Sequence, residues 1–302
     1  MTFYKRNPDP RQKPPLGSVL NPDHPLAQGL VGCWLMNEGG GSKIYDLTGN
    51  TNGTLMDVSW SSTEYGSALY FNGSTSKVDL GWEYAPQMPA TLTVIAKRIG
   101  LTGLSQGLLT TDELSFGSGT FPHSGMWLNL PVNADRIGVG YGSASGICGS
   151  GSRRSYAVTT IKYTEGLLTG IIRAALDMDI VYDGQVLSGD YSGTGGNLGY
   201  SSSTNMHAGI GAYSECADSS LYPFYGYIVA AFIHERALTI DEVQWLHAEP
   251  YSMILQPKYW HMVDFGAAGG ATYYLSASGS MGSLTGTATR KGLFKRTVEG
   301  SI

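Results

Sequence analysis

The sequence predicts an all-β protein, a sandwich of two antiparallel sheets with one short helix near residues 239–247. Charged residues make up only 14% of the chain, while glycines number 42 and tyrosines 19. Soluble proteins usually carry about 25% charged residues, so this composition favours sheets and tight turns over helices. Short apolar runs alternate with Gly- and Asn-rich clusters, which is typical of antiparallel strands and their turns.

Residues 30–36 form an unbroken apolar run bounded by glycines, which predicts a strand covered on both faces. Cys33 lies in this run, and we expect a buried thiol there. Turns follow at residues 37–41 and 48–53, because glycine and asparagine tolerate positive φ. Further strands are predicted at residues 68–71, 77–80, 91–97, 126–130, 137–141, 156–163, 169–182, 185–187, 207–213 and 224–234.

Two turns and one helix have specific local signals. Asn72-Gly73 and Asp183-Gly184 predict tight turns between neighbouring strands. Thr239 and Glu242 form a capping box, in which each side chain satisfies a backbone donor at the start of a helix. Val243 and Leu246 then face one side of a short helix that ends before Pro250.

Several of these motifs resemble a known family, the laminin-G-like, concanavalin A-like jelly rolls. The resemblance lies in Trp34, Asn37-Glu38-Gly39, Asp46, Gly49-Asn50, Gly53-Thr54-Leu55, Gly66–Gly73 and Arg236–Leu246. Residues 25–34 are similar to a variant of tailed-phage structural proteins. The resemblance covers about residues 25–250 and implies the jelly-roll fold.

Three parts follow from composition. Residues 1–24 form a proline-rich arm, residues 25–250 the jelly-roll domain, and residues 251–302 a Gly/Ser/Thr-rich extension. Proline disfavours helix and central strand, and residues 266–302 contain too few apolar side chains for a core of their own. We therefore expect neighbouring subunits or an assembly to order both ends.

Composition also argues against several partners. A net charge of −5 argues against nucleic acid, whose phosphates need concentrated Lys and Arg. No apolar run approaches the roughly 18 residues of a membrane span. The N-terminus lacks the apolar segment of a signal peptide, so we expect synthesis in a host cytoplasm.

Enzyme motifs are not found in the sequence. Glycoside hydrolases need two carboxylates across a cleft, and the usual acidic string is missing. Asp177 and Asp179 have strand spacing, but exposed carboxylates are common. Gly142–Gly146 places alanine where a serine hydrolase has its nucleophile. We predict no enzymatic activity.

Metal and glycan sites are the remaining alternatives. The resemblance implies a structural calcium ion at Glu38 and Asp46, but Val229 stands where the family's last-strand aspartate is expected. Losing one carboxylate weakens such a site, so we predict no bound cofactor. Asp46 is otherwise a turn residue bonding its own loop.

Aromatic and cysteine residues leave two further questions open. Trp60, Trp82 and Trp127 are the candidate stacking faces for a glycan, and the alternative is that they fill the core or a subunit interface. Cys148 and Cys216 are the two cysteines that could pair.

The resemblance and the two arms favour a non-enzymatic structural protein of a phage virion, a head decoration or fibre component. Its partners would be other virion proteins or copies of itself. The alternative is a carbohydrate-binding module that attaches a particle to host or environmental glycans.

Overall fold

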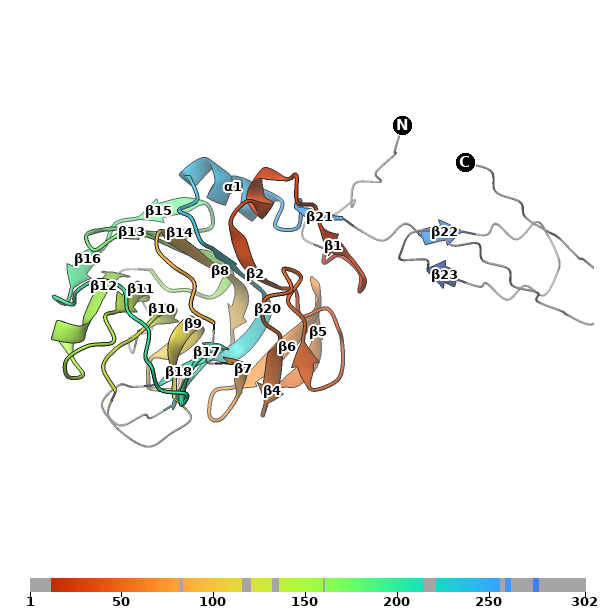
Figure 1. The fold of residues 1–302 in the computed structure, drawn as a ribbon. Helices are drawn as coiled ribbons and strands as arrows, with labels where there is room; N and C mark the ends of the chain where they lie inside the picture. The colour runs from red at the N-terminus through yellow and green to blue at the C-terminus, as the bar shows by residue number, and fades with distance from the viewer. Residues whose placement is uncertain are drawn as a thin grey trace, which may run out of the picture. The chain divides into compact units, whose positions relative to one another are not determined.

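A computed structural model describes residues 12–81, 84–115, 121–131, 136–159, 161–214 and 221–255, with the backbone of 259–261 and 274–276. Contacts divide the chain into two units, residues 1–256 and 257–302 (Figure 1). In the second unit β22 (Tyr259–His261) pairs antiparallel with β23 (Tyr274–Ser276). The first unit contains the sandwich.

Two antiparallel sheets form the sandwich over the described residues, as predicted (Figure 1). The larger sheet has nine strands in the order β16 (Asp190–Ser192), β12 (Arg153–Val158), β11 (Ile137–Gly142), β10 (Met126–Leu130), β9 (Gln106–Ser115), β17 (Met206–Ile210), β7 (Lys77–Gly81), β4 (Gly53–Met56) and β3 (Lys43–Ile44). The second sheet has eight, in the order β15 (Gln185–Leu187), β14 (Asp177–Tyr182), β13 (Glu165–Ala174), β8 (Ala90–Arg98), β20 (Tyr225–His234), β6 (Gly66–Asn72) and β5 (Ser59–Thr63), with β2 (Leu30–Trp34) also paired to β20. The chain is thus the predicted all-β sandwich of two antiparallel sheets with one short helix.

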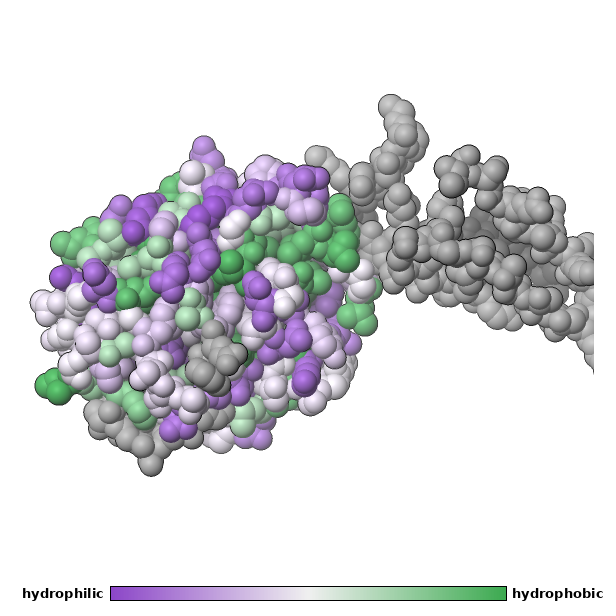
Figure 2. All heavy atoms as spheres, viewed as in Figure 1, coloured by the Kyte–Doolittle hydropathy of each residue, from purple (hydrophilic) through white to green (hydrophobic). Residues whose placement is uncertain are grey.

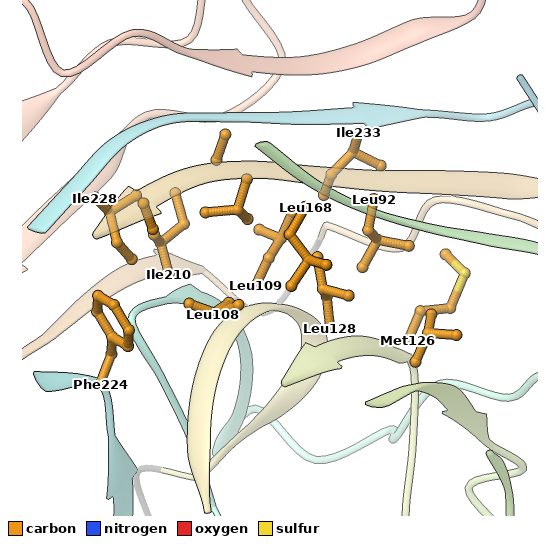
Figure 3. Close-up of a cluster of buried hydrophobic side chains, with 14 of the residues drawn as sticks. Leu92, Leu108, Leu109, Met126, Leu128, Leu168, Ile210, Phe224, Ile228 and Ile233 are labelled. Atoms are coloured by element: carbon orange, nitrogen blue, oxygen red, sulfur yellow. The ribbon is translucent and has the colours of Figure 1, made fainter. Parts of the chain in front are cut away.

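The main core fills the space between the two sheets. Leu109, Leu128 and Ile210 from the nine-stranded sheet meet Leu92 and Leu168 from the eight-stranded sheet (Figure 3). All five are fully buried. Burial of such a side chain stabilises the fold by about 1.5–3 kcal/mol, so this layer is the main source of stability.

A second apolar cluster covers the outer face of the eight-stranded sheet. Helix α1 (Ile240–Ala248) contributes Val243 and Leu246, and the 3-10 turn η1 (Pro25–Ala27) contributes Leu26. Cys33 lies in this cluster as a fully buried free thiol, and burial raises its pKa well above the usual value. Thr239 and Glu242 form the predicted capping box.

The described part of the N-terminal arm lies against its own sandwich. β1 (Val19–Leu20) pairs with β21 (Ile254–Leu255), and the Lys13 ammonium donates hydrogen bonds to the carbonyls of Met36 and Ser67. Burial lowers the pKa of Lys13 to about 7. The expectation that neighbours order the arm is therefore wrong for residues 12–24, because their polar groups have partners within the chain. Residues 1–11 and the side chains beyond residue 255 lie outside the described residues.

The Asn72-Gly73 turn does not join paired strands as predicted. β6 and β7 on either side belong to different sheets. The Asn72 side-chain oxygen accepts hydrogen bonds from the amides of Ser74, Thr75 and Ser76, which bends the chain from one sheet to the other. The same residue types serve a hairpin and a crossover, so the local signal was ambiguous.

Two predicted strands are each divided. Residues 169–182 form β13 and β14, which pair with each other across a turn at residues 175–176 that no Gly, Pro or Asn marks. Residues 207–213 break at Gly211, whose φ is +78°. Beyond it β18 (Ala212–Ser214) pairs with β19 (Leu221–Pro223). A 3-10 turn, η2, spans Ser150–Ser152.

The surface mixes polar and apolar residues over most of the face in Figure 2. Hydrophobic residues gather near β1 and β21 in this view, where Leu16 and Val19 are more than half exposed. Within the described residues, no helix is long and apolar enough to cross a membrane.

Candidate functional site

A groove of about 620 Å³ lies on the outer face of the eight-stranded sheet, beside helix α1. Its apolar part comes from three neighbouring strands, with Ile95 on β8, Leu167 on β13 and Val229 on β20. Ile95 and Leu167 are direct cross-strand partners, so their side chains share this face. This volume lies within the range of ordinary small-molecule sites, about 300–1,000 Å³.

A row of cross-strand partners leads into the groove, and its last three members line it. Tyr70 on β6 pairs with Tyr227 on β20, Tyr227 pairs with Lys97 on β8, and Lys97 pairs with Glu165 on β13. The two tyrosine rings lie 5.4 Å apart. Lys97 Nζ lies 2.8 Å from Glu165 Oε2, and both side chains are about half exposed. The row therefore joins an aromatic surface to an ion pair that solvent reaches.

One wall of the groove is the turn between β14 and β15. Asp183 has a φ of +50° and Gly184 of +73°, as the predicted Asp-Gly turn requires. The Asp183 carboxylate lies over Gly166, where an added Cβ would be 2.5 Å from Oδ1. Burial, with a smaller effect from the nearby Glu165, raises the pKa of Asp183.

Helix α1 supplies the adjoining wall. Gln244 Nε2 donates a hydrogen bond to the Gly184 carbonyl at 3.2 Å, which ties the helix to the turn. His247 lines the groove one helical turn further on. Tyr251 follows the helix, lines the groove and is only 7% exposed, with its ring in the second apolar cluster.

The β5–β6 connection forms the opposite side. Glu64 and Tyr65 lie at its tip and line the groove. Gln12 Nε2 donates to the Glu64 carbonyl at 3.0 Å, and Lys13 packs beside Gly66. The N-terminal segment therefore supports this wall from behind.

A second cleft, of about 670 Å³, lies near the start of β2. Its polar side chains already have partners in the sandwich. The Tyr84 hydroxyl and Asn50 Nδ2 both donate to the Val31 carbonyl, and Thr51 Oγ1 donates to the Leu80 carbonyl. It therefore offers a ligand fewer unpaired groups than the groove.

Trp60 and Trp127, the two predicted tryptophans that the structure describes, lie in different sheets. Trp60 is half-buried at the edge strand β5, packs against the main core and donates from Nε1 to the Gly41 carbonyl. Trp127 is 6% exposed on β10 in the other sheet, with its ring 5.5 Å from that of His123. Trp82 lies outside the described residues. The glycan-binding role of these three residues stays a prediction.

The two predicted metal ligands are engaged by backbone groups. Asp46 Oδ1 accepts hydrogen bonds from the amides of Cys33 and Thr48, and Oδ2 from the Thr51 amide and the Thr48 hydroxyl. Glu38 Oε1 accepts from an amide, while its Oε2 is buried with no partner. No group of three His, Cys, Asp or Glu side chains among the described residues could hold a metal. These hydrogen bonds are those of a turn residue that bonds its own loop. Whether Glu38 and Asp46 bind calcium is untested, and the absence of a bound cofactor stays a prediction.

A buried polar cluster at the end of β9 has no sequence motif. Asp112 and Glu113 are each 2% exposed. Glu113 Oε1 lies 2.5 Å from His123 Nδ1, and its Oε2 accepts from the Ser124 amide. Asp112 Oδ2 accepts from the Ser201 amide at 2.5 Å, and burial raises the pKa of Asp112 to about 7. These bonds join β9 to two loops.

Of the two cysteines predicted as a possible pair, only Cys148 lies in the described part of the chain. Cys148 is disulfide-bonded. Cys216 lies outside the described residues.

On the sequence alone, no residue of the groove is assigned to a binding site. Its parts come from residues 62–65, 95–97, 165–167, 227–229 and 247–251, which no motif connects. The only local signal was Asp183-Gly184, which marked a turn and not a site. The carboxylates considered in its place, Asp177 and Asp179, are both ion-paired to Arg173.

No family model matches the chain, and no curated protein matches it. Solved structures with a similar fold include a Trypanosoma rangeli sialidase in complex with difluorosialic acid, at 17% identity and TM-score 0.42, covering 74% of this chain and 34% of that one. A Ruminococcus gnavus sialidase CBM40 bound to sialyllactose matches at 14% identity and TM-score 0.45, covering 60% and 96%. The botulinum neurotoxin serotype D binding domain matches at 12% identity and TM-score 0.48, covering 72% and 51%. The chain spans about a third of the sialidase, and likenesses this distant carry no argument about function.

Proposed function

We propose that this chain is a carbohydrate-binding β-sandwich domain whose binding site is the groove beside helix α1. One observation carries the proposal. The groove combines an apolar floor, a partly exposed tyrosine and a polar rim, built largely on strands of one sheet. Rigid elements bind with little loss of entropy, because their side chains are already in place.

This combination matches the chemistry of a sugar ring. A pyranose has faces of C–H groups and an edge of hydroxyls, so it needs an aromatic or apolar surface with hydrogen-bonding groups around it. Tyr227 offers an aromatic side chain that remains partly exposed. Lys97 donates and Glu165 accepts at the rim, and each retains about half its exposure in the ion pair. Ligand sites commonly join an apolar lining to a few placed polar groups.

Hydrolysis is the competing function, because Glu165 and Asp183 both line the groove. A glycosidase needs one carboxylic acid with a raised pKa and a second carboxylate free to act. Asp183 has a raised pKa, but Glu165 is committed to Lys97 at 2.8 Å. That ion pair favours binding over catalysis, and release of reducing ends from a bound oligosaccharide would show the opposite.

The role as a phage structural protein stays a prediction that rests on the sequence resemblance and on the composition of the two chain ends. It is compatible with carbohydrate binding, since a virion surface protein can attach a particle to glycans. Capsid and tail genes beside the coding gene would support the virion role, and their absence would remove it.

The experiment is equilibrium binding of the full chain to a panel of neutral and charged oligosaccharides, by titration calorimetry. We expect Tyr227→Ala to weaken the best ligand about tenfold or more, equivalent to about 1.4 kcal/mol of lost contact. Tyr45→Ala is the matched control, because Tyr45 is 56% exposed and does not line the groove. The melting temperature of both variants checks folding. Equal binding by Tyr227→Ala and the unchanged protein would exclude the groove as the site.

A further inference from the structure

The charges around the groove are unequal. Glu64, Glu165 and Asp183 line it, against Lys97 as the only Lys or Arg side chain lining it in the described residues. Lys97 is already neutralised by Glu165, at 2.8 Å. The groove therefore carries excess negative charge, which attracts cations and repels anions.

Asp183 is the carboxylate in the groove that is best placed to bind a cation. It has no ion pair among the described residues, and the glycine at 166 leaves space for its carboxylate against β13. Glu165 is close enough to repel it, whereas His247 is the charged neighbour that lowers its pKa. A cation placed beside Asp183 would relieve this repulsion, because opposite charges within a few ångströms favour the ionised carboxylate.

A second, independent feature indicates a polar ligand. Tyr251 is more than nine-tenths buried and lines the groove, and its hydroxyl makes no hydrogen bond to the described residues. The hydroxyl oxygen itself is not fully buried, so a molecule in the groove can reach it. A ligand hydroxyl or amine in the groove would satisfy it.

The type of cation follows from the geometry. A divalent metal is not favoured, since no set of three ligating side chains occurs among the described residues. A primary ammonium has three donors and needs no fixed coordination shell. The apolar floor of Ile95, Leu167 and Val229 and the adjoining Tyr227 suit the C–H faces of a sugar that carries such a group.

We propose that the groove selects glycans bearing a free primary amine, with the ammonium held at Asp183. This rests on the proposed carbohydrate-binding function and adds the class of sugar. N-acetylation of the same sugar removes the charge and adds bulk, so the acetylated form binds more weakly. Anionic sugars are repelled by Glu64 and Asp183.

The test is titration calorimetry of the full chain with an oligoglucosamine and with its fully N-acetylated form, at low salt and about pH 5.5, because the sugar's amines are less basic than an α-amino group of pKa about 8 and are largely protonated only in mild acid. We expect the amine form to bind at least tenfold more tightly, and this preference to shrink as salt screens the charges. Asp183→Asn should reduce the preference to less than threefold. Asparagine accepts a positive φ as readily as aspartate, so this variant keeps the turn.

Asp190→Asn is the matched control, because Asp190 is an exposed aspartate on β16 of the other sheet. It should keep the full preference. Equal affinity for the two sugar forms would overturn the amine selection while leaving the carbohydrate function standing. Failure of every glycan in the panel to bind would overturn the carbohydrate function itself. Binding of free lysine or a lysine-rich peptide as tightly as the amino sugar would assign the ammonium to a protein partner instead.

Discussion

Removal of the Asp46 carboxylate tests the role of the first long loop. Asp46 is 7% exposed and accepts four hydrogen bonds, from the amides of Cys33, Thr48 and Thr51 and from the Thr48 hydroxyl. In Asp46→Ala the buried Cys33 amide loses its side-chain partner, which costs about 1–3 kcal/mol. The other three donors are part-buried and each lose about 0.5–1.5 kcal/mol. We expect the free energy of unfolding to fall by about 3–7 kcal/mol, the combined size of these losses.

Urea unfolding followed by tryptophan fluorescence measures this loss, because Trp34 lies beside the loop and its Nε1 donates to the Thr51 carbonyl. Asp23→Ala is the control, since Asp23 is exposed and its carboxylate accepts no hydrogen bond in the described residues; it should change stability by less than about 0.5 kcal/mol. The measurement is repeated with a chelator. A loss below about 1 kcal/mol in Asp46→Ala would refute the hydrogen-bond reasoning. An equal loss in the unchanged protein on adding the chelator would assign Asp46 to a metal site.

Three further predictions concern stability. Burial lowers the pKa of His234 to about 4, so the stability that the neutral imidazole contributes is complete above about pH 6.5 and is lost as pH falls towards 4. In urea titrations over that range, the free energy of unfolding should fall by about 3 kcal/mol more in the unchanged protein than in His234→Gln. Burial raises the pKa of Asp112 to about 7, so between pH 4 and 7 the folded protein keeps a proton that the unfolded chain releases, and the fold loses stability as pH rises. Asp112→Asn should therefore be more stable than the unchanged protein by about 2–4 kcal/mol at pH 7 and equally stable at pH 4. A difference that does not change with pH would contradict the buried carboxylate. A Cβ at Gly211 would lie 1.9 Å from the Phe71 ring, so Gly211→Ala should lower the free energy of unfolding by more than about 3 kcal/mol. Gly17→Ala is the control, because Gly17 has a similar positive φ with nothing within 4 Å, and it should lose only about 1 kcal/mol. Equal losses would show that backbone strain, and not the clash with Phe71, determines the loss.

Local chemistry determined several elements from the sequence alone. The capping box at Thr239 and Glu242 specified where the helix begins, because both partners lie within one turn. The apolar run after Gly29 specified β2, and Asp183-Gly184 specified a turn with two positive φ angles. In each case the residues that interact are neighbours in the chain.

Tertiary structure alone decided what these elements do together. Asn72-Gly73 had a hairpin signal, yet the two strands beside it entered different sheets, because burial of Phe71 and Val78 in a shared core decides the direction of each strand. The groove depends on partners such as Lys97 and Glu165, which are 68 residues apart in the sequence. They are adjacent only because β8 pairs with β13. Exposed residues on a sheet face follow no pattern that marks them as a site. The sequence therefore determined the type of fold through local turns, caps and apolar periodicity, while the candidate site arose from strand order and register, which only long-range packing specifies.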